Sequence, residues 1–433
     1  QWPGTIFESS PGRAARGPHG PPPSAAGTSL CLGSGFTPWG ARVNRRLGAL
    51  FLFSVIDTLG FGILIPLVPY MGDRFGAKPE LITSILGSYS LCQLIAAPWW
   101  GRLSDRYGRR PILMSSLAGA CLSYVILGLA RNLWWLLASR MLAGLMAGNI
   151  AAAFAYASDV SPPEKRAASM GLVGAAIGVG FTLGQPLGGL LAGADARTAD
   201  FAAPAAVSAA LSVLAILLVR FVLPESHTGE QRRAHPDEPR RGSVRLLRER
   251  PALAFMAAAT LLVTYSQSIL ESIFAIWALH RYGLGPRGVG LLLFGVALPA
   301  LTMQGGLVRV LAPRFGEVPL AICGALAYVA GLATLAVSAT LPATIAGLIA
   351  CGAGLGAYNP SAFALASRQA RGHDRGAVMG TYVASASLAR VLGPFTSGAI
   401  YTLWGPSAPF LVGACVTLPA AWLVGRLRSA RAA

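Results

Sequence analysis

Four ionisable side chains lie inside long apolar runs of this 433-residue sequence. The carboxylates are Asp57 and Glu271, and the cations are Arg140 and Arg390. A charge at the centre of a bilayer costs at least ~2.5–3.5 kcal/mol on insertion scales, so each group is expected to face a cavity or a partner. Two interpretations are open. Permanent ion pairs could hold helices together, or carboxylates could gain and lose protons as their neighbours change. We favour the second interpretation, proton coupling.

Polar and aromatic residues in the same runs are candidates for binding a solute. Gln267 precedes Glu271 by one helical turn and is expected on the same helix face. Asn149 and Asn359 occupy corresponding places 210 residues apart, and Tyr358 offers an aromatic contact. These polar groups could contact a substrate or simply bridge neighbouring helices, and the sequence does not decide between the two.

The elements that position these residues are predicted membrane helices. Apolar residues make up 54% of the chain and charged residues 12%, about half the ~25% charged content usual in soluble domains. A run of about 20 apolar residues can cross a ~30 Å bilayer core as a helix. Such runs recur at about 48–70, 81–100, 111–130, 133–157, 170–193, 201–222, 252–278, 288–308, 318–338, 341–363, 377–400 and 406–425. We therefore expect an integral, multi-pass, all-α membrane protein with twelve transmembrane helices.

The placement of the basic residues predicts the topology. The net charge is +18, but the arginines gather in alternate loops instead of forming a nucleic-acid-binding surface. One set of loops holds Arg102, Arg106, Arg109 and Arg110, together with seven arginines between Arg232 and Arg250. By the positive-inside rule, both termini are expected in the cytoplasm, at the inner (plasma) membrane if the source is bacterial. The basic surplus would contact anionic membrane lipid, and no nucleic-acid partner is expected.

The chain divides into two similar halves. We expect a disordered N-terminal tail over 1–42, a six-helix half over 43–223, a cytoplasmic linker over 224–250 and a second six-helix half over 251–433. An interfacial helix is possible near 244–250. "GRLSDRYGRRP" at 101–111 aligns without gaps on "RVLAPRFGEVP" at 309–319. This internal duplication predicts two pseudo-symmetric halves with a binding site near mid-membrane, at their interface.

The sequence favours no catalytic chemistry. The six cysteines are scattered without a metal-ligand spacing. Neither a nucleophile–base arrangement nor a cofactor motif appears, and the Walker lysine motif of ATP-driven transport is absent. We therefore expect no enzyme, no cofactor and no metal site.

The charged loop after the second run resembles the signature between helices two and three of the major facilitator superfamily. The matching residues include Gly101, Asp105, Arg106, Gly108, Arg109 and Arg110. The resemblance covers about 43–426 and implies the major facilitator fold. It also suggests a gating role for this loop. Gly101 and Gly108 would shape a tight turn, and Asp105 would oppose the amino end of a second-half helix when the cytoplasmic side is shut.

Two further motifs narrow the resemblance. "RMLAGLMAGN" from Arg140 is similar to the family's fourth-helix motif, and "GFTLGQPLGG" is similar to the fifth-helix motif of drug–proton antiporters. The residues of the latter are Gly180, Gly184, Pro186, Gly188 and Gly189. "DTLGFGILIPLVP" in the first run points to the tetracycline-exporter-like branch. The motif normally places proline directly after its glycine, whereas here Gln185 intervenes. The acidic residues of tetracycline exporters in helices three and nine are also absent.

These features predict a proton-coupled secondary transporter that exports small amphipathic compounds or drugs by alternating access, acting as a monomer. Proton-coupled uptake of a nutrient such as a sugar or organic anion is the alternative. A non-transporting membrane receptor is a less favoured class. Asp57 is expected to lie near Arg140, and Glu271 has Arg390 as its only deep basic candidate.

The topology can be tested by cysteine labelling in intact cells. Cysteines placed at Arg131 and Gly242 should react from the outside and from the inside respectively, because the arginine-rich loops stay in the cytoplasm. Labelling of the Gly242 position from outside would show that the topology is inverted.

Overall fold

The computed structural model describes residues 38–162, 165–226, 243–370 and 375–429. Contacts within the chain separate Gln1–Ala41 from a second unit, Arg42–Ala433. Residues 1–37 of the predicted tail over 1–42, and 227–242 of the predicted linker, lie outside the described residues. Residues 38–42 belong to the first helix instead of a disordered tail. A short helix forms where an interfacial helix was considered possible, at Ser243–Glu249.

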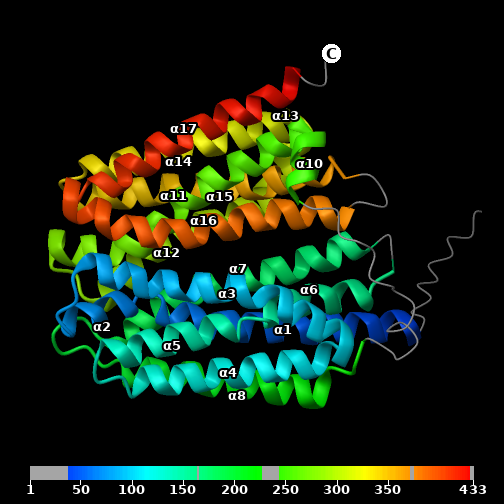
Figure 1. Cartoon of the computed structure of the whole chain (residues 1–433), viewed down its shortest axis with the longest axis horizontal. Helices are drawn as coiled ribbons and strands as arrows, with labels where there is room; N and C mark the ends of the chain where they lie inside the picture. Colours follow the sequence, from blue (N-terminus) through cyan, green and yellow to red (C-terminus); the bar gives the residue numbers. More distant parts are fainter. Residues whose placement is uncertain (1–37, 163–164, 227–242, 371–374, 430–433) are drawn as a thin grey trace, which may run out of the picture. The chain divides into compact units, whose positions relative to one another are not determined.

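The second unit is helical throughout its described part (Figure 1). The first half contains α1 (Pro38–Leu64), α2 (Val68–Arg74), α3 (Pro79–Tyr107), α4 (Arg109–Gly128), α5 (Leu133–Leu145), α6 (Asn149–Asp159), α7 (Arg166–Ala192) and α8 (Ala202–Val222). The second half contains α10 (Ser243–Glu249), α11 (Pro251–Tyr282), α12 (Pro286–Thr302), the π-helix η1 (Met303–Leu307), α13 (Val308–Phe315), α14 (Glu317–Val337), α15 (Leu341–Ser367), α16 (Arg375–Trp404) and α17 (Ala408–Ser429).

Among the described residues, eleven helical segments are long and apolar enough to cross a membrane. Three of them combine successive elements: α1 with α2, α5 with α6, and α12 with η1 and α13. The twelfth predicted span, 377–400, coincides with α16, which is long enough but is not among the eleven. Polar residues of α16, such as Thr381, Ser385 and Arg390, lower its hydropathy. The sequence therefore places this helix correctly, although its composition differs from that of the others.

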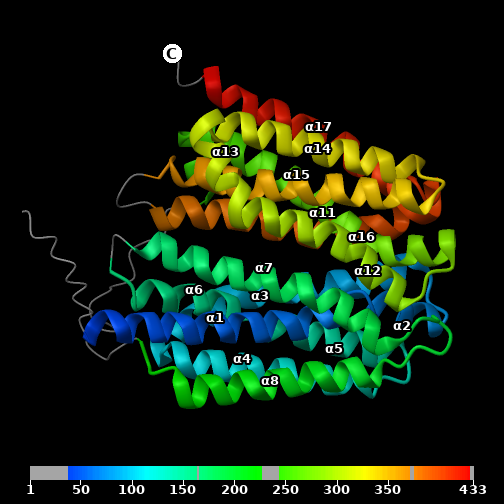
Figure 2. The same cartoon turned by 180° about the vertical axis from the view of Figure 1, so that it is seen from behind.

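The helices form two groups that pack side by side (Figures 1 and 2). Within the groups, α4 packs along α8, α14 along α15, and α11 along both α16 and α17. Between the groups, α7 packs along α12 and α3 along α16. These two pairs form the interface on which the halves meet.

The helix α7 approaches both of its partners closely through glycine. A Cβ atom added at Gly184 would lie 2.7 Å from the Leu59 carbonyl oxygen, and one at Gly188 would clash with the Ile63 carbonyl, both on α1. On the other side, a Cβ at Gly189 would clash with the Pro286 carbonyl of α12. Small residues at a four-residue spacing permit this backbone contact. The glycine-rich helix-five motif is therefore where α7 packs against α1 and α12.

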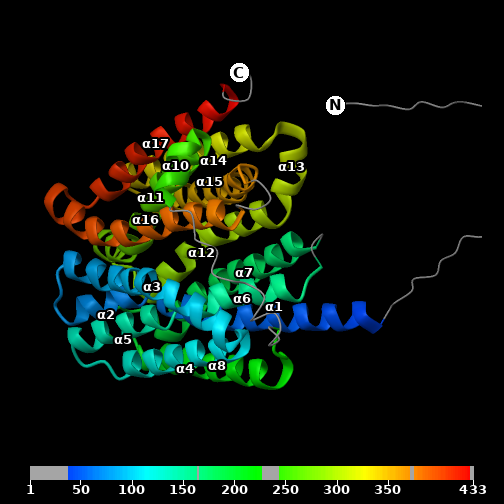
Figure 3. The same ribbon diagram turned by 45° about the vertical axis from the view of Figure 1, so that its right-hand side comes forward.

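The two halves are in contact at the end of the bundle where α2 lies and α12 begins, opposite to the end where α1 begins. There the Tyr70 hydroxyl donates to the Leu284 carbonyl at 2.7 Å, and the Arg287 N–H donates to the Gly193 carbonyl at 3.1 Å. Gly398 on α16 packs on the first turn of α3. Toward the opposite end, where α1 begins and α17 ends (Figure 3), Gly171 and Gly174 of α7 face open space. Among the described residues, the hydrogen bonds between the halves lie at the end away from the start of α1.

A paired glycine substitution tests the close packing of α7. Gly188→Ala should destabilise the protein by about 1–3 kcal/mol, because the added methyl group meets the rigid backbone of α1. The control, Gly174→Ala in the same helix, should leave the melting temperature unchanged or raise it, since alanine is the better helix former. Thermal unfolding of the purified variants provides the measurement. Equal melting temperatures would contradict the packing.

Candidate functional site

A cavity of about 160 Å³ lies where the two halves meet. It is formed by α7, α11, α12, η1 and α15, and its polar lining consists of Thr182, Gln185, Gln267, Glu271, Gln304 and Asn359. The rest of the lining is apolar or glycine, with Phe181, Leu270 and Leu293 among it. An apolar wall with a few polar groups is the usual composition of a small-molecule site.

The side chain of Glu271 is exposed, and it is the carboxylate of this cavity. Gln267 donates a hydrogen bond from Nε2 to Glu271 Oε1 at 2.8 Å, as their four-residue spacing predicts. The cavity wall contains no basic residue. Among the described residues, no ion pair joins Glu271 to Arg390, which is itself exposed on α16. Glu271 is thus the carboxylate that this cavity presents to a solute, with Gln267 as its hydrogen-bond partner.

Two residues of the cavity were not singled out from the sequence. Gln304 lies on the π-helix η1, and Thr182 lies on α7 beside Gln185. Single π-turns inside helices occur frequently at functional sites. The segment "MQGG", which places a glutamine and two glycines inside an apolar run, is the sequence feature that could have revealed Gln304.

The second predicted carboxylate lies in a separate cluster within the first half. Asp57 on α1 is buried and accepts a hydrogen bond from the Asn149 side chain. Asn149 is the first residue of α6, directly after the helix breaks at Met146–Gly148. Ser116 satisfies the freed backbone there, accepting from the N–H groups of Gly148 and Asn149. The broken helix thus places an amide group against the buried carboxylate.

The predicted contact between Asp57 and Arg140 is not found in the described part of the chain. Arg140 is 2% exposed, and its Nε and Nη2 have no hydrogen-bond partner there. The side chains of Tyr89 and Tyr124 lie near its guanidinium. Tyr89 also lies within electrostatic range of Asp57 and of Arg390 from the other half. Asp57 and Arg140 both lie near Tyr89 and Tyr124, as expected from their depth. Asn149, which follows the break between α5 and α6, donates to the Asp57 carboxylate in place of Arg140.

The predicted binding residues lie in three different places. Asn359 lines the cavity together with Gln267, whereas Tyr358 is fully buried in the core of the second half and Asn149 belongs to the Asp57 cluster. Of the helix-five motif, Gly180, Gly184 and Gly188 pack on α1, and Gly189 packs on α12. Pro186 lies inside α7, which continues through it, and Gln185 lines the cavity.

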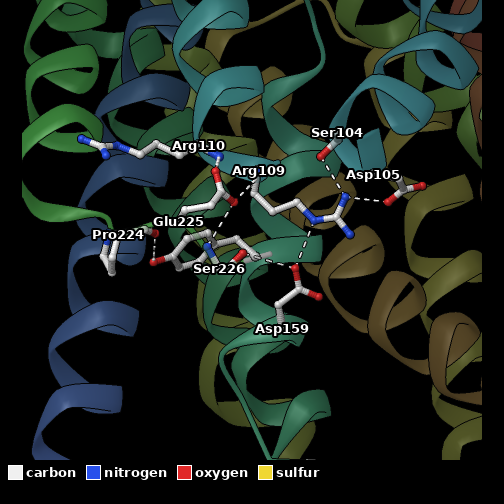
Figure 4. A network of polar contacts seen from close by, with 9 residues as sticks. Ser104, Asp105, Arg109, Arg110, Asp159, Pro224, Glu225 and Ser226 are labelled. Carbon is white, nitrogen blue, oxygen red and sulfur yellow. Dashed lines mark hydrogen bonds and ion pairs between the residues drawn. The ribbon is translucent and has the colours of Figure 1, made fainter. Parts of the chain in front are cut away.

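The charged loop forms a network of polar contacts within the first half (Figure 4). The buried Arg109 guanidinium lies 2.6 Å from Asp105 and 3.0 Å from Asp159, and it donates to Ser104 at 3.0 Å. Glu225 accepts from the N–H groups of Arg109 and Arg110, so a carboxylate caps the amino end of α4. The network joins α3, α4, α6 and the segment that follows α8.

One expectation for this loop needs correction, and the gating contact of Asp105 stays a prediction. Gly108 does form the turn, with φ at 105°, but Gly101 lies inside α3 and faces open space. Asp105 pairs with Arg109 of its own half, and no contact with a second-half helix is found among the described residues. Arg106 is exposed, with its guanidinium 5.4 Å from the centre of the Tyr107 ring.

The second half contains an equivalent ion pair at the corresponding helix ends, with the acidic and basic residues in exchanged positions. Gly316 has φ at 85° and precedes α14 as Gly108 precedes α4. Glu317 takes the place of Arg109 and pairs at 2.6 Å with Arg368, which corresponds to Asp159. The duplication seen in the sequence therefore extends to an ion pair between equivalent helix ends.

Comparison with known proteins identifies the family. The family model described as "Major Facilitator Superfamily" matches residues 50–317 and 259–433. The chain is 33% identical over 395 residues to the tetracycline resistance protein, class C, of Escherichia coli, covering 87% of this chain and 95% of that protein.

Solved structures show the same fold. The human organic anion transporter MFSD10 (TETRAN) aligns with a TM-score of 0.68 at 24% identity, over 88% of this chain and 99% of that one. A bacterial homologue of the human lysosomal transporter Spinster, in an inward-facing and occupied conformation, aligns with a TM-score of 0.72 at 16% identity, over 91% and 98%. The all-helical architecture of the described residues, the duplicated loop and these similarities agree: the chain is a membrane transporter, not an enzyme, and it belongs to the major facilitator superfamily.

Proposed function

We propose that this protein exports small amphipathic compounds in exchange for protons by alternating access. The observation that carries the proposal is the cavity between the halves, which joins an apolar wall to one exposed carboxylate, Glu271. The similarity to a tetracycline resistance protein supports drug export as the direction of transport. The helix-five motif, which packs α7 on α1 and α12, supports the same assignment.

The two carboxylates have different surroundings and therefore different proposed roles. Glu271 lines the cavity, where a proton and a solute can compete for it. Asp57 is buried against Asn149 in the first half and close to Tyr89. Its proton occupancy would change when the halves move and Arg140 or Arg390 approaches. In this proposal, Glu271 binds either a proton or the solute, and the protonation of Asp57 depends on the conformation of the two halves.

We infer that the interface is open at the end where α1 begins, since its described hydrogen bonds lie at the other end. An opening there fits the first step of export. The basic loops that we expect in the cytoplasm lie at this end. With both termini on the cytoplasmic face, the cavity is accessible from the cytoplasm and can accept a compound there. Closure of this end and opening of the other would release it outside. We propose that a monomer performs this cycle in the plasma membrane.

Transport of organic anions is a second candidate, favoured by one observation. Arg140 is buried with two N–H groups that have no hydrogen-bond partner among the described residues. An anionic solute that reached Arg140 would supply acceptors. The aligned human protein described as an organic anion transporter makes this candidate worth testing in the same assay.

Substitution of the cavity carboxylate tests the function. In proteoliposomes, Glu271→Gln should bind tetracycline or a similar amphipathic compound but lose at least tenfold of the transport driven by a pH gradient, because the amide cannot exchange a proton. The matched control, Asp195→Asn, removes an exposed carboxylate from a loop outside the spans and should transport normally. Full pH-driven transport by Glu271→Gln would remove this residue from the mechanism.

Substitution of the loop carboxylate tests the proposed gate. Asp105→Asn should cost less than ~1 kcal/mol of stability, since its carboxylate is 60% exposed and Arg109 keeps Asp159. Transport should fall, because Asp105 would no longer be available to the opposing helix when this end closes. Transport rate and the reactivity of cysteines at the open end are the measurements. Normal transport with unchanged reactivity would exclude a gating role.

A further inference from the structure

A basic pocket lies on the first half, away from the interface between the halves. It has a volume of about 400 Å³ and is lined by Arg45, Arg46, Arg110, Arg220 and the segment 221–224. Its lining contains four guanidinium groups and no carboxylate. Such a concentration of positive charge attracts an anion, and arginine suits phosphate because its N–H groups form a planar fork.

The four arginines come from three helices that end at the same side of the bundle. Arg45 and Arg46 lie near the start of α1, Arg110 is the second residue of α4, and Arg220 is in the last turn of α8. The Arg110 guanidinium donates a hydrogen bond to the backbone carbonyl of Arg220. The side chain of Arg220 is itself exposed. Arg110 Nε is buried without a hydrogen-bond partner in the described part of the chain.

The carboxylates nearest to this pocket are already engaged elsewhere. Glu225 accepts from the backbone at the start of α4, and Asp159 pairs with Arg109. Among the described residues, no ion pair involves Arg46 or Arg220. The four arginines of the pocket outnumber the two carboxylates beside it, Glu225 and Asp159, so the site keeps a net positive charge.

An apolar stripe on α8 leads directly to the pocket. Val213, Leu214, Leu217 and Phe221 are 46%, 49%, 46% and 77% exposed, which is the pattern of a helix face in contact with lipid chains. Phe221 both ends the stripe and lines the pocket, with the Arg220 guanidinium 5.9 Å from its ring centre. A free phosphate ion would use the arginines alone, whereas a phospholipid would use the arginines and the stripe together.

We propose that this pocket binds the phosphate headgroup of an anionic phospholipid, whose acyl chains lie along the exposed face of α8. The site ties the ends of α1, α4 and α8 to one lipid molecule. It does not depend on the compound that the protein transports.

Lipid titration by native mass spectrometry tests the site on the full-length protein in detergent. Dioleoyl phosphatidylglycerol should bind at one site at least tenfold more tightly than the zwitterionic phosphatidylcholine with the same chains. Arg46→Gln combined with Arg220→Gln should weaken phosphatidylglycerol binding about 30-fold, since each arginine near an anionic headgroup contributes about fivefold. The charge-conserving pair Arg46→Lys and Arg220→Lys should keep most of the binding and shows whether the substitutions disturb folding.

The matched control removes two exposed arginines at the same end of the other half. Arg309→Gln combined with Arg314→Gln should bind phosphatidylglycerol like the unmodified protein. Equal losses in the pocket and control variants would overturn the proposal, as would equal affinity for the two lipids. Inorganic phosphate that displaces phosphatidylglycerol at equal concentration would show that the site recognises a free ion and would overturn the assignment to lipid.

Discussion

The contact of α7 with both α1 and α12 is the constraint on which the arrangement of the two halves depends. Gly184 and Gly188 allow the backbone of α7 to touch α1 in its own half, while Gly189 allows it to touch α12 in the other. Without a hydrophobic driving force between helices in lipid, such close backbone packing supplies much of the attraction. Helix α7 is thus part of the packing within the first half and also part of the interface between the halves, which has to change during transport.

Each half is held together at its own helix ends, independently of that interface. Arg109 joins α4 to α6 through Asp159, and Glu317 joins α14 to the end of α15 through Arg368. Both pairs sit beside a glycine with a positive φ that turns the chain into the next helix. Since these ion pairs lie within the halves, they can persist while the halves move. The contacts between halves, such as that of Tyr70 with Leu284, are the ones that must break.

The sequence predicted most of the architecture because long apolar runs and an internal duplication leave few alternatives. The shared helix face of Gln267 and Glu271 and the place of α16 followed from spacing, and the turn at Gly108 followed from the family resemblance. The site was less predictable, since depth along a helix does not determine which neighbour a side chain meets. The break after α5 turned Asn149 toward Asp57, and Arg140 was left without that partner. Gln304 entered the cavity through a π-turn that no periodicity indicates.

The central claim is that the halves pivot about this interface and open one end as they close the other. Distances between spin labels at both ends, measured by double electron–electron resonance in nanodiscs, test it most directly. One pair replaces the exposed Arg102 and Arg314 at the open end, and the other replaces the exposed Lys78 and Trp404 at the closed end. When the pH is shifted or a transported compound is added, the first distance should shorten as the second lengthens. Distances that change in the same direction, or only at one end, would contradict the account.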